Sequence, residues 1–234
     1  SPYVLLSVAE THLATGRYKQ ADQLLDRSDF PPTLNQAVEL RRADYDFATG
    51  RLDEAFVTYD QFYGSDVMAA KPHSINNYCS MLFNRQAYAK SRQCYLNVAS
   101  MLNDTSAIGS AHYLATLAEL KAGELSARPE IEFGTIANRF PGTAAALLAE
   151  MKQADFCALN QDECAENAGQ WFHRITGRSS ARALAESATF KEALVAFLDG
   201  QYSMSIELLQ KMLRTYQSGI LQEQAQALLI QLIP

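Results

Sequence analysis

Small and large side chains recur at fixed distances from five short polar segments of the chain. The segments are centred on Gly16, Gly50, Gln86, Gly123 and Gly200. Seven positions before these centres stand small residues, namely Ala9, Ala43, Cys79, Thr116 and Ala193. Five positions after stand Ala21, Ala55, Ser91 and Ser205, and nine positions after stand Leu25, Tyr59, Tyr95 and Leu209. Each centre joins two stretches of helical patterning, so the pattern predicts a helix hairpin at each one.

The centres are regularly spaced, which predicts an internal repeat. Gly16 to Gly50 is 34 residues, Gly50 to Gln86 is 36, Gln86 to Gly123 is 37, and Gly123 to Gly200 is 77. The last interval has room for two units of about 38 residues, with the missing turn near 160–162. We therefore expect a single all-α solenoid of about six hairpins. The expected units are 2–29, 34–64, 72–102, 106–139, 142–177 and 179–218, followed by a terminal helix at 220–233.

Proline and capping signals set the expected helix boundaries. Residues 31–32 are both proline, which stops the helix before them. Thr33 and Gln36 have the spacing of a capping box, which predicts that the next helix opens there. Pro72 suits the first position of a helix, where its missing N–H costs no hydrogen bond.

The repeat resembles the tetratricopeptide repeat family over most of the chain. The matching residues are the turn residues Gly16, Gly50, Gly123 and Gly200, the small residues Ala9, Ala21, Ala43, Ala55 and Ala193, and the aromatics Tyr18, Tyr88 and Tyr202. The pattern departs at Arg128, where a small residue is expected, and the fifth unit has no turn glycine. The resemblance implies a right-handed superhelix whose first helices line a concave groove for a partner protein or peptide. Residues 139–146 also resemble the repeat junctions of bacterial periplasmic and envelope members of the family.

Composition narrows the class of protein. The 234 residues are 48% hydrophobic and 20% charged, which is typical of a globular domain. A net charge of −6 gives no electrostatic support for nucleic-acid binding. No apolar run reaches the roughly 18 residues that a membrane span needs. Helical patterning begins at the first residues, so we expect a processed protein or a fragment with further repeats beyond the termini, and a homo-oligomer is a possibility.

The four cysteines bear on the compartment. Cys157 and Cys164 flank a polar turn between two expected helices, where the helix ends can come within disulfide reach. The alternative is that both are small buried thiols. A disulfide and the junction at 139–146 favour the bacterial periplasm or envelope, and a reduced cytoplasmic protein is the alternative. No C-x-x-C pair is present and the histidines are scattered, so we expect no zinc site.

No catalytic motif is present, so we expect no enzymatic activity, no catalytic residues, no cofactor and no metal. An enzyme whose repeats only support an active site is the remaining alternative. Asp44 and Asp46 stand two positions apart, so they face different directions, and we expect a solvated face there.

Surface recognition is the function that remains. The offsets from the turns predict partner-binding residues on the first helices, namely Tyr3, Glu10, Asp44, Phe47, His73, Asn76, Phe83 and Tyr113. Asn77 joins them because the family often carries there an asparagine that hydrogen-bonds an extended ligand. Phe47 and Phe83 have an alternative role as packing between repeats. The family's basic clamp for a carboxylate-ended tail is absent, since Leu6, Glu10 and Leu40 stand at its positions.

Two functions follow from this pattern. The first is a non-catalytic interaction scaffold that binds a peptide or helix of a partner in its groove. The second is a structural segment of a larger bacterial envelope assembly or secretion complex, docking through the apolar terminal helix at 220–233.

Overall fold

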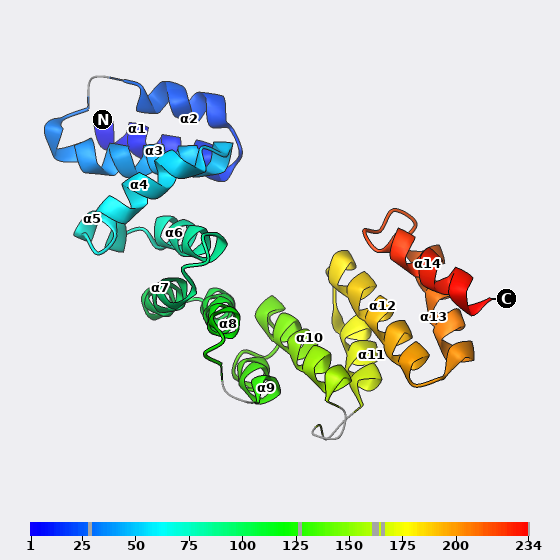
Figure 1. The fold of residues 1–234 in the computed structure, drawn as a ribbon. Coiled ribbons are helices and arrows are strands. Elements are labelled where there is room, and N and C mark those ends of the chain that lie inside the picture. The colour runs from blue at the N-terminus through cyan, green and yellow to red at the C-terminus, as the bar shows by residue number, and fades with distance from the viewer. Residues whose placement is uncertain (28–29, 126–127, 161–163, 165–166, 234) are drawn as a thin grey trace. The chain divides into compact units, whose positions relative to one another are not determined.

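The computed structural model is helical throughout the residues that it describes, which are 1–27, 30–125, 128–160, 164 and 167–233. Within these ranges it contains fourteen α-helices, one 3-10 helix and no strand (Figure 1). The chain divides into two compact units, Ser1–Glu124 and Leu125–Pro234. The expected all-α class is confirmed, and the single continuous solenoid stays a prediction.

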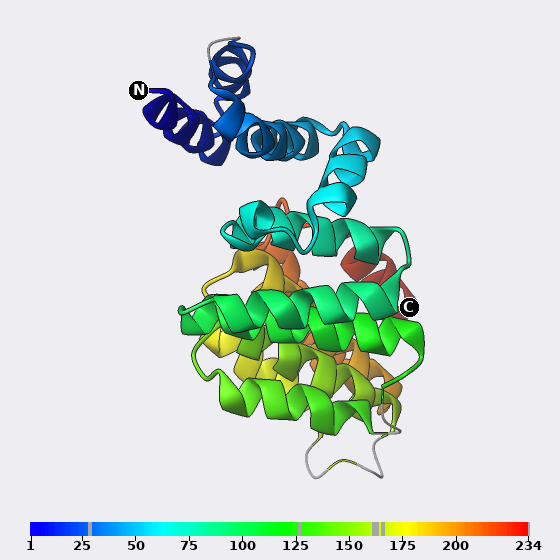
Figure 2. The ribbon, with the colours of Figure 1, turned by 90° about the vertical axis from the view of Figure 1, so that its left-hand side faces the viewer.

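Unit 1, Ser1–Glu124, is built largely from sequential antiparallel helix pairs. Its α-helices are α1 (Pro2–Ala14), α2 (Tyr18–Leu25), α3 (Asn35–Thr49), α4 (Leu52–Phe62), α5 (Asp66–Ala69), α6 (Pro72–Asn84), α7 (Tyr88–Met101) and α8 (Thr105–Ala122). The pairs α1/α2, α3/α4 and α6/α7 are the three predicted hairpins, and α7 also packs along α8 (Figure 2). The first helices contact each other as well, α1 with α3 and α3 with α6.

Unit 2, Leu125–Pro234, continues the sequential packing with helices of similar length. They are α9 (Pro129–Arg139), α10 (Ala144–Leu159), α11 (Ala168–Arg178), α12 (Arg182–Leu198), α13 (Tyr202–Thr215) and α14 (Gln222–Leu232). Each of these helices packs on the next one along the chain. The boundary between the units falls inside the expected hairpin 106–139, and the turn expected near 160–162 lies partly outside the described residues.

All five predicted turn centres adopt the left-handed backbone conformation that ends a helix. Their φ angles are +71° at Gly16, +86° at Gly50, +62° at Gln86, +74° at Gly123 and +73° at Gly200. In each turn the residue after the centre donates its N–H to the carbonyl four positions before the centre, as Arg51 does to Asp46 and Gln201 to Ala196, both at 2.8 Å. The same turn therefore recurs in both units, as the sequence predicted.

The small residues pack where the two helices of a hairpin cross. Ala9, Ala43, Cys79 and Ala193 are at most 1% exposed, and so are Ala21, Ala55, Ser91 and Ser205. Ser91 Oγ donates to the carbonyl of Cys79 at 2.9 Å, and Ser205 Oγ donates to the carbonyl of Ala193 at 2.8 Å. The third and sixth predicted hairpins therefore each have the same serine-to-carbonyl hydrogen bond where their two helices cross. Thr116 is half-buried, so the fourth unit departs from the pattern.

Two local features differ from the sequence prediction. The capping box is wrong, because Thr33 lies in a 3-10 helix over Pro32–Leu34 and α3 begins at Asn35 without a side-chain cap. The two prolines at 31–32 favour that tight turn and delay the helix start. The short helix α5 was not predicted, and the Ser65 hydroxyl caps it by accepting from the Met68 N–H at 3.4 Å.

Two disulfides join the four cysteines. The Cys157–Cys164 bond is confirmed. The Cys79–Cys94 bond was not predicted, and it fastens α6 to α7 across a hairpin with a sequence separation of 15. Both bonds indicate an oxidising, extracytoplasmic compartment. Among the described helices, none combines the length and the apolar character that a bilayer-spanning segment needs.

Candidate functional site

An open groove of about 620 Å³ lies in unit 1 between the first helices of three successive hairpins. We call it the α1–α3–α6 groove, since its walls come mainly from those helices and from the segment just before α6. It contains five of the nine predicted partner-binding residues, namely Glu10, Asp44, Phe47, His73 and Asn77. The first helices contact each other directly, which places these residues side by side.

A buried ion pair forms the floor of this groove. Arg41 and Asp44, three positions apart on α3, are 5% and 4% exposed and form a close salt bridge. Ser74 links them, because Arg41 Nη2 donates to its hydroxyl at 3.2 Å and that hydroxyl donates to Asp44 Oδ2 at 3.1 Å. The solvated face expected around Asp44 is therefore wrong, since its charge is compensated inside the protein.

Tyr59 on α4 connects this pair to α6. Its hydroxyl donates to Asp44 Oδ1 at 2.7 Å and accepts from Asn77 Nδ2 at 3.2 Å. Burial, followed by the Asp44 charge, raises the pKa of Tyr59 far above its ordinary value. The phenol therefore stays protonated and keeps donating to Asp44. Asn77 is 5% exposed and is held by this bond, and its Nδ2 also lies 3.4 Å from His73 Nε2.

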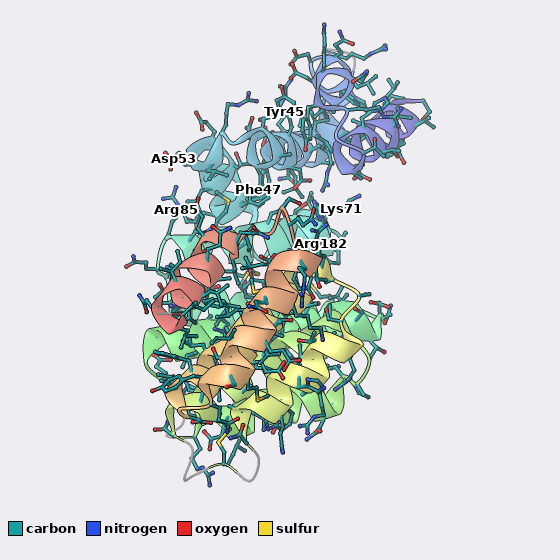
Figure 3. All side chains as sticks on the ribbon, turned by 90° about the vertical axis from the view of Figure 1, so that its right-hand side faces the viewer. Tyr45, Phe47, Asp53, Lys71, Arg85 and Arg182 are labelled. Atoms are coloured by element: carbon teal, nitrogen blue, oxygen red, sulfur yellow. A yellow bond between two sulfur atoms is a disulfide. The ribbon has the colours of Figure 1, made fainter. Side chains whose placement is uncertain are left out.

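A second pair of charges stands above the floor. Lys71, labelled in Figure 3, stands just before α6. Its Nζ lies 2.5 Å from Glu10 Oε1, and the same oxygen lies 3.4 Å from Arg41 Nε. The side chains of Lys71 and Glu10 are 39% and 30% exposed, so this pair is reached by solvent. Two acids and two bases thus offset each other, and the groove carries little net charge at its centre.

Apolar side chains form the rim. Leu13 and Phe47 are half-buried, whereas Tyr18 is 38% exposed. Pro72 adds a rigid apolar surface at the start of α6. The groove therefore offers apolar contacts around a neutralised polar floor.

The other four predicted partner-binding residues do not line the groove. Tyr3 is 65% exposed on α1, and Asn76 is half-buried on α6. Phe83 packs edge-on against the Tyr88 ring, with centroids 5.3 Å apart, so it fastens its own hairpin. Tyr113 is only 8% exposed on α8.

Sequence reasoning missed Arg41, Lys71, Tyr59 and Ser74 in this network. One signal was available, because Arg41 stands nine positions before Gly50 and Asn77 stands nine positions before Gln86. That shared offset places both side chains in the groove. Lys71 precedes its helix, so no periodic offset applied to it.

A second cavity, of about 830 Å³, lies in unit 2 between α11, α12 and α13. We call it the α11–α13 cavity, and no sequence prediction anticipated it. Glu192 on α12 lies against it with 4% exposure, and its Oε1 is 3.0 Å from Nδ1 of His173, whose side chain is 72% exposed. Burial raises the pKa of Glu192, although His173 and then Lys211 act in the opposite direction.

Neither site resembles a metal centre, since no three His, Cys, Asp or Glu side chains gather to hold an ion within the described ranges. No protein-family model matches the chain, and no curated protein matches its sequence. What the structure establishes is an all-helical fold with sequential hairpin contacts, compatible with a helical repeat.

Proposed function

We propose that the chain is a tetratricopeptide-repeat-like, non-catalytic interaction scaffold that binds a peptide or helix of a partner protein in the α1–α3–α6 groove. The observation that supports this most is the groove itself, an open volume of about 620 Å³ between three successive first helices. In such repeats the first helices face the concave side of a right-handed solenoid, where ligands bind.

The groove chemistry favours a ligand with apolar anchors. Its charges are internally paired, so a strongly charged ligand would have to break the pair of Lys71 with Glu10. Leu13, Tyr18 and Phe47 offer apolar contact area at the rim. A helix or extended segment with aliphatic or aromatic side chains fits this surface.

A matched pair of variants tests this proposal. Phe47→Ala removes a rim side chain, whereas Val57→Ala truncates an apolar residue that is 67% exposed on α4 outside the groove. Partners captured from a periplasmic extract should be lost with Phe47→Ala and retained with Val57→Ala, with equal helicity in both variants. Equal capture by both variants would place recognition elsewhere.

The second candidate function is a docking segment of a larger bacterial envelope assembly, supported by the surface of the last helix. Ile220, Ile230 and Ile233, in and beside α14, are 75%, 75% and 49% exposed. A capping helix at the end of a repeat array ordinarily has a polar outer face. Sedimentation should show self-association or partner binding that Ile230→Glu removes. Leu159→Glu, at a site 80% exposed on α10, is the control that leaves it intact.

A bacterial periplasmic or envelope location is part of both proposals. It rests on the junction at 139–146 and on the bonds Cys79–Cys94 and Cys157–Cys164. Thiol titration of the denatured, unreduced protein should find all four cysteines oxidised. Four titratable thiols in protein isolated with alkylation from its native source would favour a cytoplasmic location.

A further inference from the structure

The α11–α13 cavity differs in construction from the groove of unit 1. In the expected hairpins, α12 is a first helix, whereas α11 and α13 are second helices. The cavity is therefore lined mainly by second helices. The sequence prediction placed the binding surface on first helices, so it did not anticipate a cavity here. It is also the larger of the two volumes, about 830 Å³ against about 620 Å³. Its chemistry is independent of the proposed peptide groove.

Glu192 is the unusual residue of this cavity. Its side chain is 4% exposed, yet its contact at 3.0 Å is the imidazole of His173, which is 72% exposed. Burial raises the pKa of Glu192 in spite of the opposing effects of His173 and Lys211. The carboxylate therefore lacks part of the positive charge that would compensate its loss of water.

The neighbouring positive charges do not fully compensate the buried carboxylate of Glu192. The Arg174 guanidinium lies over the Trp171 ring, 4.5 Å from its centroid. Lys211 on α13 contributes the weakest of the effects on Glu192. Asp199 and Glu207 add two further carboxylates to the lining.

The walls of the cavity suit a long aliphatic stem. Val195 and Ala196 from α12 and Met204 and Leu208 from α13 supply apolar surface beside the carboxylate. Lysine and arginine side chains bury their methylene stems against such surfaces while the charged end finds a polar partner. A guanidinium can also form two parallel hydrogen bonds with one carboxylate.

We propose that the α11–α13 cavity binds a basic side chain of a polypeptide, with its guanidinium or ammonium group on Glu192 and its stem against Val195, Met204 and Leu208. Without a ligand, the His173 imidazole contacts the Glu192 carboxylate. Because 72% of its side chain is exposed, the imidazole can turn into solvent and exchange its contact with Glu192 for hydrogen bonds with water.

Calorimetric titration with two short peptides tests this proposal. The probes are acetyl-Ala-Ala-Arg-Ala-Ala-amide and the same peptide with citrulline, which keeps the shape of arginine and loses its charge. We expect saturable binding of the arginine peptide, about tenfold or more tighter than the citrulline peptide, because a hydrogen bond to a buried charge depends on ionisation of both groups. Fluorescence of Trp171, the single tryptophan, should change during the same titration. Equal binding of both peptides, or no saturable binding, overturns the proposal.

Variants of the full chain locate the site. Glu192→Gln preserves volume and should weaken the arginine peptide about tenfold or more while leaving helicity intact. His173→Gln removes the competing imidazole and should bind at least as tightly as the parent. Phe47→Ala should have no effect, which separates this site from the unit 1 groove. Undiminished binding by Glu192→Gln overturns the proposal, and equally tight binding of free agmatine overturns its polypeptide part.

Discussion

Asp44 in unit 1 and Glu192 in unit 2 are both carboxylates that are 4% exposed, and they differ in what surrounds them. Asp44 has a close ion pair with buried Arg41 and accepts hydrogen bonds from Tyr59 and Ser74. Glu192 has an exposed imidazole at 3.0 Å and a raised pKa. The same helix-ending turn recurs in both units, so the turn residues do not determine how a buried charge is compensated. The residues between the turns determine it.

The largest expected effect comes from breaking the compensated pair. Asp44→Ala leaves Arg41 buried without its close partner, which should lower the free energy of unfolding by about 3 kcal/mol or more. Urea unfolding followed by circular dichroism measures this. Asp46→Ala is the control, because its partner Arg51 has a side chain that is 49% exposed, and it should cost much less than Asp44→Ala. Similar losses in both variants would show that Asp44 is not the buried partner described here.

A second expected effect concerns a buried carboxylate of unit 2 that is compensated by backbone. Glu186, 2% exposed, accepts from the Leu221 N–H at 2.8 Å, and a methyl group at Gly219 would overlap its carboxylate. Gly219→Ala should therefore destabilise by about 2 kcal/mol by removing that hydrogen bond. Gly177→Ala is the matched control, because nothing lies within 4 Å and alanine favours a helix. The contrast fails if Gly219→Ala is as stable as Gly177→Ala.

Exchanging residues between the turns of the two units should give a smaller effect. Gln86 adopts a φ of +62°, a left-handed conformation that costs a residue other than glycine about 1 kcal/mol. Gln86→Gly in unit 1 should therefore stabilise by up to about 1 kcal/mol, and Gly200→Gln in unit 2 should destabilise by a similar amount. Thermal unfolding measures both. Changes of the same sign in the two variants would refute the equivalence of these turns.

The smallest expected effect is a dependence of stability on pH at Glu192. Because its folded-state pKa is raised above the ordinary value of 4.5, the folded protein binds this proton more tightly than the unfolded chain. Its contribution to stability is therefore full below pH 4.5 and decreases as pH rises through the window above that value. Glu192→Gln should show a flatter decrease than the parent in urea unfolding from pH 4.5 to 7. Identical slopes would show that Glu192 titrates alike in both states.

Sequence patterning predicted the repeated geometry well, because each hairpin depends on residues close together in the chain. Gly50 and Gln86 take the conformation that their position demands, and Ala43 and Ala55 are buried as their spacing requires. Thr33 shows the limit even of local signals, since the adjacent prolines override its capping pattern.

The polar network was not predictable in the same way. Asp44 is buried because Tyr59 and Ser74 reach it from other helices, and no single period describes those contacts. The Cys79–Cys94 bond likewise depends on the crossing of α6 and α7. In unit 2, the cavity brings together residues from 167 to 211, and only the packing of three helices distinguishes Glu192 from a surface acid.

The network around Asp44 has a consequence for how this array can evolve. Its members come from α3, α4 and α6, so the second and third hairpins are bound to each other by specific chemistry as well as by shape. Deleting the third hairpin would uncover the Arg41–Asp44 pair, and deleting the second would leave Ser74 and Asn77 of α6 without these partners. We therefore expect these two hairpins to be kept together in a fixed order, unlike the interchangeable modules from which repeat arrays are usually assembled.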